Sequence, residues 1–170
     1  MAQGFSPVKT MGRDLEPTIR VLGLGNDLLA DDAFGMEIVR ELGAHLPPGV
    51  QTASSIASGF GLLDDLLDAD RLIVVDTISS GQAAPGTVHR FEEGEVTAAG
   101  GTSPHYVGLF ETLRLGRALG LHVPGCVVIL AVEAGDCLTI GGAMGREMRA
   151  AMPVVVRMVD ATVAGWIAGP

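Results

Sequence analysis

The sequence predicts an α/β fold: one three-layer domain with a mostly parallel, twisted five-stranded sheet, one antiparallel strand and helices on both faces. Short runs rich in Val and Ile alternate with segments whose apolar residues recur at helical spacing, which is typical of a parallel sheet covered on both faces. With 170 residues, 48% of them hydrophobic and 18% charged, the chain is long enough for one well-buried domain.

The predicted strands are apolar runs bounded by turn residues or helical patterns. The fourth run follows the third after SSGQAAPG, a connection too short for a crossover helix, so this strand is expected to be antiparallel. The strands are expected at residues 19–24, 50–56, 71–76, 86–91 and 126–132.

Helical spacing of apolar residues predicts three helices. One apolar stripe covers residues 34–42, and a second covers residues 107–113 after Pro104, a favoured first helical residue. A third pattern over residues 143–168 contains Pro153, which predicts a kink or break there.

Composition limits the partners and the compartment. We expect residues 1–18 to be a flexible lead-in and residues 19–170 to form the single domain. The net charge of −9 argues against nucleic acid or an anionic membrane surface as a partner, and no uncharged apolar run approaches the ~20 residues of a membrane span. Two cysteines, Cys126 and Cys137, form no disulfide framework, which favours the reducing cytoplasm.

Several acidic residues and one histidine fall where an α/β sheet places its sites. In such sheets ligands bind beyond the carboxyl ends of the strands. Asp31 and Asp32 follow the first strand, Asp76 ends the third, and His105 lies in the first turn of a helix. Glu133, after the last strand, is a weaker candidate.

Asp32, Asp76 and His105 together offer two carboxylates and one imidazole. Three protein ligands leave positions open for water or substrate, which is the pattern of a catalytic metal site. Each residue also has a structural interpretation: Asp31 and Asp32 as a helix cap and a first-turn acid, Asp76 as a turn cap, and His105 as a histidine bonded to a carbonyl.

Other site classes have less support. After Gly23 and Gly25 a dinucleotide motif requires glycine at position 28, which is Leu28, and no phosphate-loop motif is present. No nucleotide is therefore expected, and a phosphorylase-like or nucleoside-handling enzyme is disfavoured. Neither the GxSxG elbow of serine hydrolases nor the HExxH motif of common zinc proteases occurs.

The sequence resembles the NiFe-hydrogenase maturation endopeptidases. Their opening pattern, GxGNxLxxD[DE]xxG after a strand, is matched by residues 23–35. The later elements are an apolar strand ending in Asp, a Pro-Gly-Thr strand start, and Ser-Pro-His followed by Gly-Leu. They are matched in order by residues 71–76, 85–87 and 103–109.

The resemblance implies a function and a set of site residues. Members remove a short C-terminal peptide from the hydrogenase large-subunit precursor after nickel insertion, as cytoplasmic accessory proteins. The family's metal-binding positions correspond to Asp32, Asp76 and His105, and the nickel is expected to be supplied by the substrate. Asp31 would hold the loop or assist proton transfer.

The chain departs from the family pattern at three places. Ala33 replaces a frequent glycine, and Ala134 replaces a proline after the last strand. In place of Asp-Gly-Gly-Thr-x-Gly the chain has residues 54–59, of which only Gly59 agrees. The last two departures are expected to face the substrate.

Three mechanisms are compatible with these residues. Nickel held by the trio could position the precursor and polarise its carbonyl or activate water. Alternatively, Asp32 and Asp76 share a proton and activate water directly, so that the protein acts as an aspartyl endopeptidase with nickel used for recognition alone. A third interpretation is a chaperone that docks on the nickel-loaded precursor without cutting it.

Overall fold

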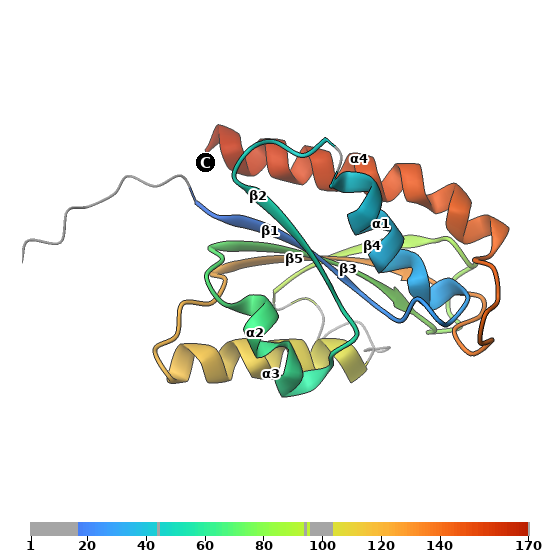
Figure 1. Cartoon of the computed structure of the whole chain (residues 1–170), viewed down its shortest axis with the longest axis horizontal. Coiled ribbons are helices and arrows are strands. Elements are labelled where there is room, and N and C mark those ends of the chain that lie inside the picture. Colours follow the sequence, from blue (N-terminus) through green and yellow to red (C-terminus); the bar gives the residue numbers. More distant parts are fainter. Residues whose placement is uncertain (1–16, 44, 94, 96–103, 170) are drawn as a thin grey trace, which may run out of the picture.

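The computed structural model describes residues 17–43, 45–93, 95 and 104–169, and the side chains of residues 104–107 are outside that description. The predicted lead-in, residues 1–18, lies almost entirely outside the described residues. At its end, the N–H of Thr18 donates to a carboxylate oxygen of Asp70 at 2.7 Å. The described residues form a five-stranded sheet with helices on both faces, which confirms the predicted fold (Figure 1).

The sheet has the order β2-β1-β3-β5-β4, with every neighbouring pair parallel except β4 and β5. The antiparallel strand is therefore the predicted one. The main difference from the sequence prediction is at β3, which continues two residues past Asp76 and pairs Ile78 with Glu133. The strands are β1 (Ile19–Leu24), β2 (Val50–Ser55), β3 (Arg71–Ile78), β4 (Val88–Glu92) and β5 (Cys126–Glu133).

The sheet separates two hydrophobic cores. On one face α1 (Phe34–Leu42) and α4 (Arg146–Ala168) pack on the strands, and on the other α2 (Leu63–Leu66) and α3 (Pro104–Ala118) do so (Figure 1). Two short 3₁₀ helices, η1 (Asp31–Ala33) and η2 (Gly59–Leu62), precede α1 and α2. Alternate residues of the inner strands are buried on opposite faces, so the middle parts of β1, β3 and β5 are apolar, and the buried polar residues Asp76, Thr77 and Glu133 lie at the carboxyl ends of β3 and β5.

Helix α4 runs through Pro153 as one continuous helix. The sequence predicted a kink or a break at this residue, and the break does not occur. Pro153 is exposed, and buried residues on either side, including Met148 and Val155, anchor the helix to the sheet. This packing offsets the hydrogen bond that proline cannot make. Among the described helices α4 alone has the length and apolar composition of a membrane span, with a mean hydropathy of 1.4.

Two glycines allow the start of α1 to pack directly on the sheet. A Cβ on Gly35 would lie 2.3 Å from the carbonyl oxygen of Leu24 and 2.5 Å from that of Val75. A Cβ on Gly25, which has a φ of +136°, would lie 1.9 Å from the carbonyl oxygen of Asp32. Only glycine permits this backbone contact, which brings the acidic residues before α1 against the ends of β1 and β3.

Gly35→Ala should lower the free energy of unfolding by about 3 kcal/mol, because the new methyl group meets two backbone oxygens that cannot move aside. Gly165→Ala is the matched control. It lies within α4 with no atom near its Cβ position, and it should raise stability by about 0.5–1 kcal/mol. Urea unfolding measures both, and equal stability of the two variants would contradict the close-contact argument.

Candidate active site

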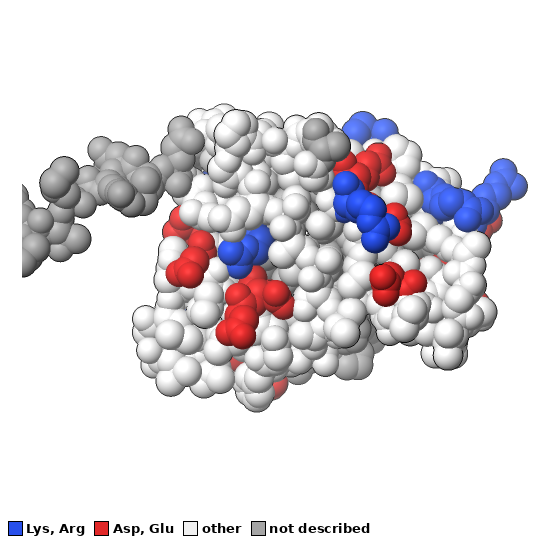
Figure 2. Space-filling view, viewed as in Figure 1, with Lys and Arg blue, Asp and Glu red and all other residues white. Residues whose placement is uncertain are grey.

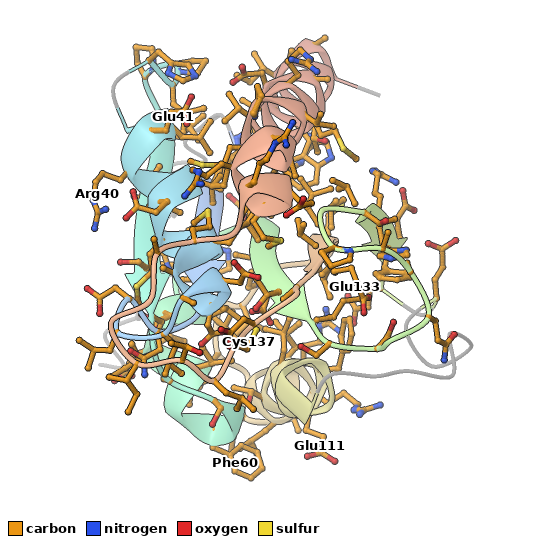
Figure 3. The ribbon with its side chains drawn as sticks, turned by 90° about the vertical axis from the view of Figure 1, so that its right-hand side faces the viewer. Arg40, Glu41, Phe60, Glu111, Glu133 and Cys137 are labelled. Carbon is orange, nitrogen blue, oxygen red and sulfur yellow. The ribbon has the colours of Figure 1, made fainter. Side chains whose placement is uncertain are left out.

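The predicted site residues lie at the carboxyl edge of the parallel strands. Helix α3, which carries His105 in its first turn, begins at the end of the molecule where β1, β3 and β5 finish (Figure 1). Figure 3 looks onto this end, where Cys137 lies between the layer of α1 and that of α3, and Phe60 lies on the outer side. The structure thus brings the backbone of all the predicted segments to one edge.

Asp31 joins the first loop to the last one. Its side chain is buried, and its Oδ2 accepts hydrogen bonds of 2.9 Å from the N–H groups of Gly135 and Asp136. Its Oδ1 accepts a third, of 2.6 Å, from the N–H of Gly145 at the start of α4. The predicted capping of its own helix is wrong, since η1 has no side-chain cap. The carboxylate holds the β5–α4 loop instead.

Asp32 and Asp76 are linked through Thr77. The hydroxyl of Thr77 donates to Oδ1 of Asp32 at 2.9 Å, and the N–H of Thr77 donates to Oδ1 of Asp76 at 2.8 Å. Asp76 is fully buried, whereas Asp32 is half-buried. One threonine therefore fixes one oxygen of each carboxylate.

The alternation of β3 decides which layer Asp76 faces. Leu72, Val74 and Ile78 belong to the core beneath α2 and α3, so Asp76 points to that side, on which α3 begins. The structure therefore places Asp76 on the same side as the helix of His105. The side chain of His105 lies outside the described residues.

Cys137 lies beside the same cluster. Its sulfur is 3.8 Å from the hydroxyl oxygens of both Thr77 and Ser79. Burial raises the pKa of the thiol and outweighs the hydrogen bonds with Ser79 and Thr77, which lower it; the negative charges of Asp32 and Asp31 add smaller contributions that raise it. The side chain is a neutral thiol near neutral pH.

Glu133, the weaker candidate, is a buried residue with a structural contact. Its carboxylate accepts hydrogen bonds of 2.8 Å from the hydroxyl of Ser80 and from the N–H of Gly81, in the connection that follows β3. It thereby holds this connection at the edge of the site (Figure 3).

Sequence reasoning missed Thr77 and assigned no role to Cys137. Thr77 directly follows Asp76, but the prediction ended the strand at Asp76 and so gave Thr77 no direction. Within the described part of the chain no group of three or more His, Cys, Asp or Glu side chains is arranged to hold a metal. Asp32 and Asp76 lie there, and the third predicted ligand, His105, is outside it.

The sequence matches the hydrogenase maturation protease (HycI) family model over residues 36–162. The chain belongs to this family. HupD of Thiocapsa roseopersicina is 32% identical over 148 residues, which are 84% of this chain and 66% of HupD. Hydrogenase 2 maturation protease of Escherichia coli is 40% identical over 106 residues, 60% of this chain and 65% of that protease. The alignments thus span just under two thirds of these relatives.

Solved structures agree with this membership. The hydrogenase maturating endopeptidase HybD from Escherichia coli superposes with a TM-score of 0.74 at 32% identity, covering 86% of this chain and 91% of HybD. A HybD from Thermococcus kodakarensis, at 22% identity and a TM-score of 0.68, shares the fold and covers 85% of this chain and 97% of its own. The resemblance noted from the motifs is confirmed at the level of the family.

Asp31→Asn should lower the free energy of unfolding by roughly 3 kcal/mol, because an amide cannot accept all three N–H groups and leaves part of the loop unsatisfied. Asp27→Asn, at an exposed position of the same loop, should change it by less than about 0.5 kcal/mol. Urea unfolding measures both. An unchanged midpoint for Asp31→Asn would show that the carboxylate does not hold the loop.

Alkylation of Cys137 should have a pH midpoint above the usual thiol value of 9.0, because only the thiolate reacts and burial raises its pKa. Asp32→Asn should move this midpoint down by removing a negative charge. Peptide mass spectrometry after timed iodoacetamide treatment follows Cys137, with exposed Cys126 as the internal reference. A midpoint below 8 would be inconsistent with the buried thiol.

Proposed function

We propose that this chain is an endopeptidase of the cytoplasm that removes the C-terminal extension of a NiFe-hydrogenase large-subunit precursor once nickel has been inserted. The main observation behind this proposal is that Thr77 donates hydrogen bonds to the carboxylates of both Asp32 and Asp76 at the carboxyl end of the strands. The chain that carries them belongs to the maturation protease family. The names of the relatives support the choice of substrate: they describe hydrogenase maturation and, for HybD of Escherichia coli, an endopeptidase.

The donor set suits a metal ion brought by the substrate. The hydroxyl of Thr77 donates to Oδ1 of Asp32, and the described residues make no hydrogen bond to its Oδ2, so this oxygen is available to a ligand. Asp76 adds a buried carboxylate on the side of α3, and His105 in the first turn of that helix adds an imidazole in our proposal. Carboxylate oxygen and imidazole nitrogen both suit nickel.

The chemistry proposed is hydrolysis of a peptide bond next to that metal. The precursor's nickel, bound between its own ligands and this trio, would polarise the scissile carbonyl or lower the pKa of an attacking water. Asp32 and Asp76 orient the metal, and Asp31 keeps the surrounding loop in place. The hydrogen bonds of Asp31 account for this holding role without requiring proton transfer by Asp31.

No arrangement among the described residues favours the chaperone interpretation over the two enzyme mechanisms. The two-carboxylate mechanism shares Asp32 and Asp76 with the metal mechanism, but it requires neither His105 nor nickel for bond cleavage. The two mechanisms therefore predict different losses when His105 or nickel is removed.

The decisive experiment incubates the purified chain with nickel-loaded and nickel-free large-subunit precursor and follows the precursor's intact mass. Wild type should release one defined C-terminal peptide from the nickel-loaded form alone. Asp32→Ala and His105→Ala should slow the release at least roughly 100-fold, because each removes a contact to the metal. Asp27→Ala, at an exposed acid of the same loop, is the matched control and should cleave normally.

Two results would contradict the proposal. Cleavage of nickel-free precursor at the wild-type rate, unaffected by His105→Ala, would favour the two-carboxylate mechanism. A precursor that binds this chain and keeps its full mass would identify a chaperone.

A further inference from the structure

We infer that the open edge of β2 is a docking site for an extended segment of the precursor, which adds to the sheet as a further strand. The inference rests on the proposed function for the identity of the partner. It goes beyond that function by assigning recognition to a part of the molecule distinct from Asp32, Asp76 and His105. Addition of a strand to a sheet edge is a common way to bind an extended peptide.

The backbone of β2 presents unused hydrogen-bonding groups on its outer side. The carbonyl of Ser55 accepts from the N–H of Gly25, so Ser55 faces β1. Because residues of a strand alternate in direction, Thr52 and Ser54 direct their N–H and C=O groups away from β1. Among the described residues β2 pairs with β1 alone.

The edge of β2 lacks the features that normally protect an open edge. Exposed edges are commonly guarded by charged side chains, proline or a bulge. Residues 50–60, VQTASSIASGF, contain no charged residue and no proline. The opposite edge, β4, carries Arg90 and Glu92, which form an ion pair. The β4 edge therefore carries charged side chains that discourage strand pairing, and the β2 edge does not.

The surface agrees with this contrast. In Figure 1 β2 crosses the front of the sheet, and in the same view Figure 2 shows a largely uncharged centre flanked by charged side chains. The side chains at Thr52 and Ser54 are small and exposed, so they leave room for an incoming backbone.

The open edge leads to the candidate active site. The hydrogen bond from Gly25 to Ser55 ties the end of β2 to the loop that carries Asp31 and Asp32. Beyond that end Ile56 is 77% exposed and Phe60 is 62% exposed, although both are large and apolar. A chain lying along β2 would therefore pass from polar backbone contacts onto an apolar rim beside the site.

An extended peptide segment fits these features better than a folded surface. The edge offers main-chain hydrogen bonds in a line, neutral side chains that impose no charge, and two apolar side chains at one end. The C-terminal extension of a precursor is such a segment when it reaches the cutting site as extended chain.

Amide hydrogen exchange of the full chain, with and without the nickel-loaded precursor, tests the docking site directly. The amides of Thr52 and Ser54, which point away from β1, should exchange rapidly in the free protein and at least ten-fold more slowly in the complex, while the amides of the β4 edge should not change. The measurement uses His105→Ala as well as wild type, because this variant should cleave the precursor slowly and so keep the complex intact. The β2 edge is separate from His105, so the substitution should not affect docking there.

A proline substitution tests the same edge through kinetics. Ser54→Pro removes an outward N–H but no hydrogen bond to β1, and proline is tolerated in this orientation on edge strands. It should raise KM for the precursor roughly ten-fold and leave kcat unchanged, because lost backbone hydrogen bonds weaken binding alone. Arg90→Pro on the β4 edge is the matched control and should leave both constants unchanged. Urea unfolding establishes that both variants fold, and Thr52→Lys serves in place of Ser54→Pro if that variant does not fold.

The outcomes separate the docking site from the catalytic proposal. New protection at the outward amides of Thr52 and Ser54 without cleavage would support the docking site and overturn the endopeptidase. Cleavage with no protection, and with a normal KM for Ser54→Pro, would overturn the docking site and leave the endopeptidase standing. Protection that grows with protein concentration in the absence of precursor would assign the edge to a second copy of this chain and also overturn the inference.

Discussion

Three backbone N–H groups converge on the carboxylate of Asp31, and the shape of the site depends on this contact. Gly135 and Gly145, two of the donors, lie more than a hundred residues further along the chain, so one buried charge joins the first and last loops of the sheet edge. An ionised side chain is costly to bury unless several hydrogen bonds compensate for its lost hydration. The neighbouring Asp32 is then free to face Thr77.

Glycine makes the second contribution to this arrangement. Because Gly35 has no Cβ, the start of α1 lies against the carbonyl groups of Leu24 and Val75, and because Gly25 has none, the carbonyl of Asp32 lies against the end of β1. Larger residues would push η1 away from the sheet and separate Asp32 from Thr77. The spacing of glycines and acids in residues 23–35 is thus explained by contact distances as well as by the chemistry of the acids.

Local pattern was enough to predict the fold and the end of the sheet at which the candidate site residues lie. Alternation of apolar runs and helical stripes identified the five strands and three of the four α-helices, and the short connection SSGQAAPG identified the antiparallel strand. It did not identify the partner of Asp31, the extra length of β3 or the position of Thr77, because each depends on contacts between residues far apart in the sequence. The continuous path of α4 through Pro153 likewise depends on its burial against the sheet.

In the proposed function, the β2 edge and the carboxylates at the strand ends together restrict cutting to a finished precursor. Backbone pairing along β2 is insensitive to sequence, so by itself it would accept many extended chains. In the proposed metal mechanism the carboxylates at the strand ends contact the substrate through its nickel, so by themselves they would not select the chain to be cut. A site that requires both an extended tail and a bound nickel ion acts only where the two occur together. Weak contacts at each place are then sufficient, because their binding free energies combine when one substrate engages both.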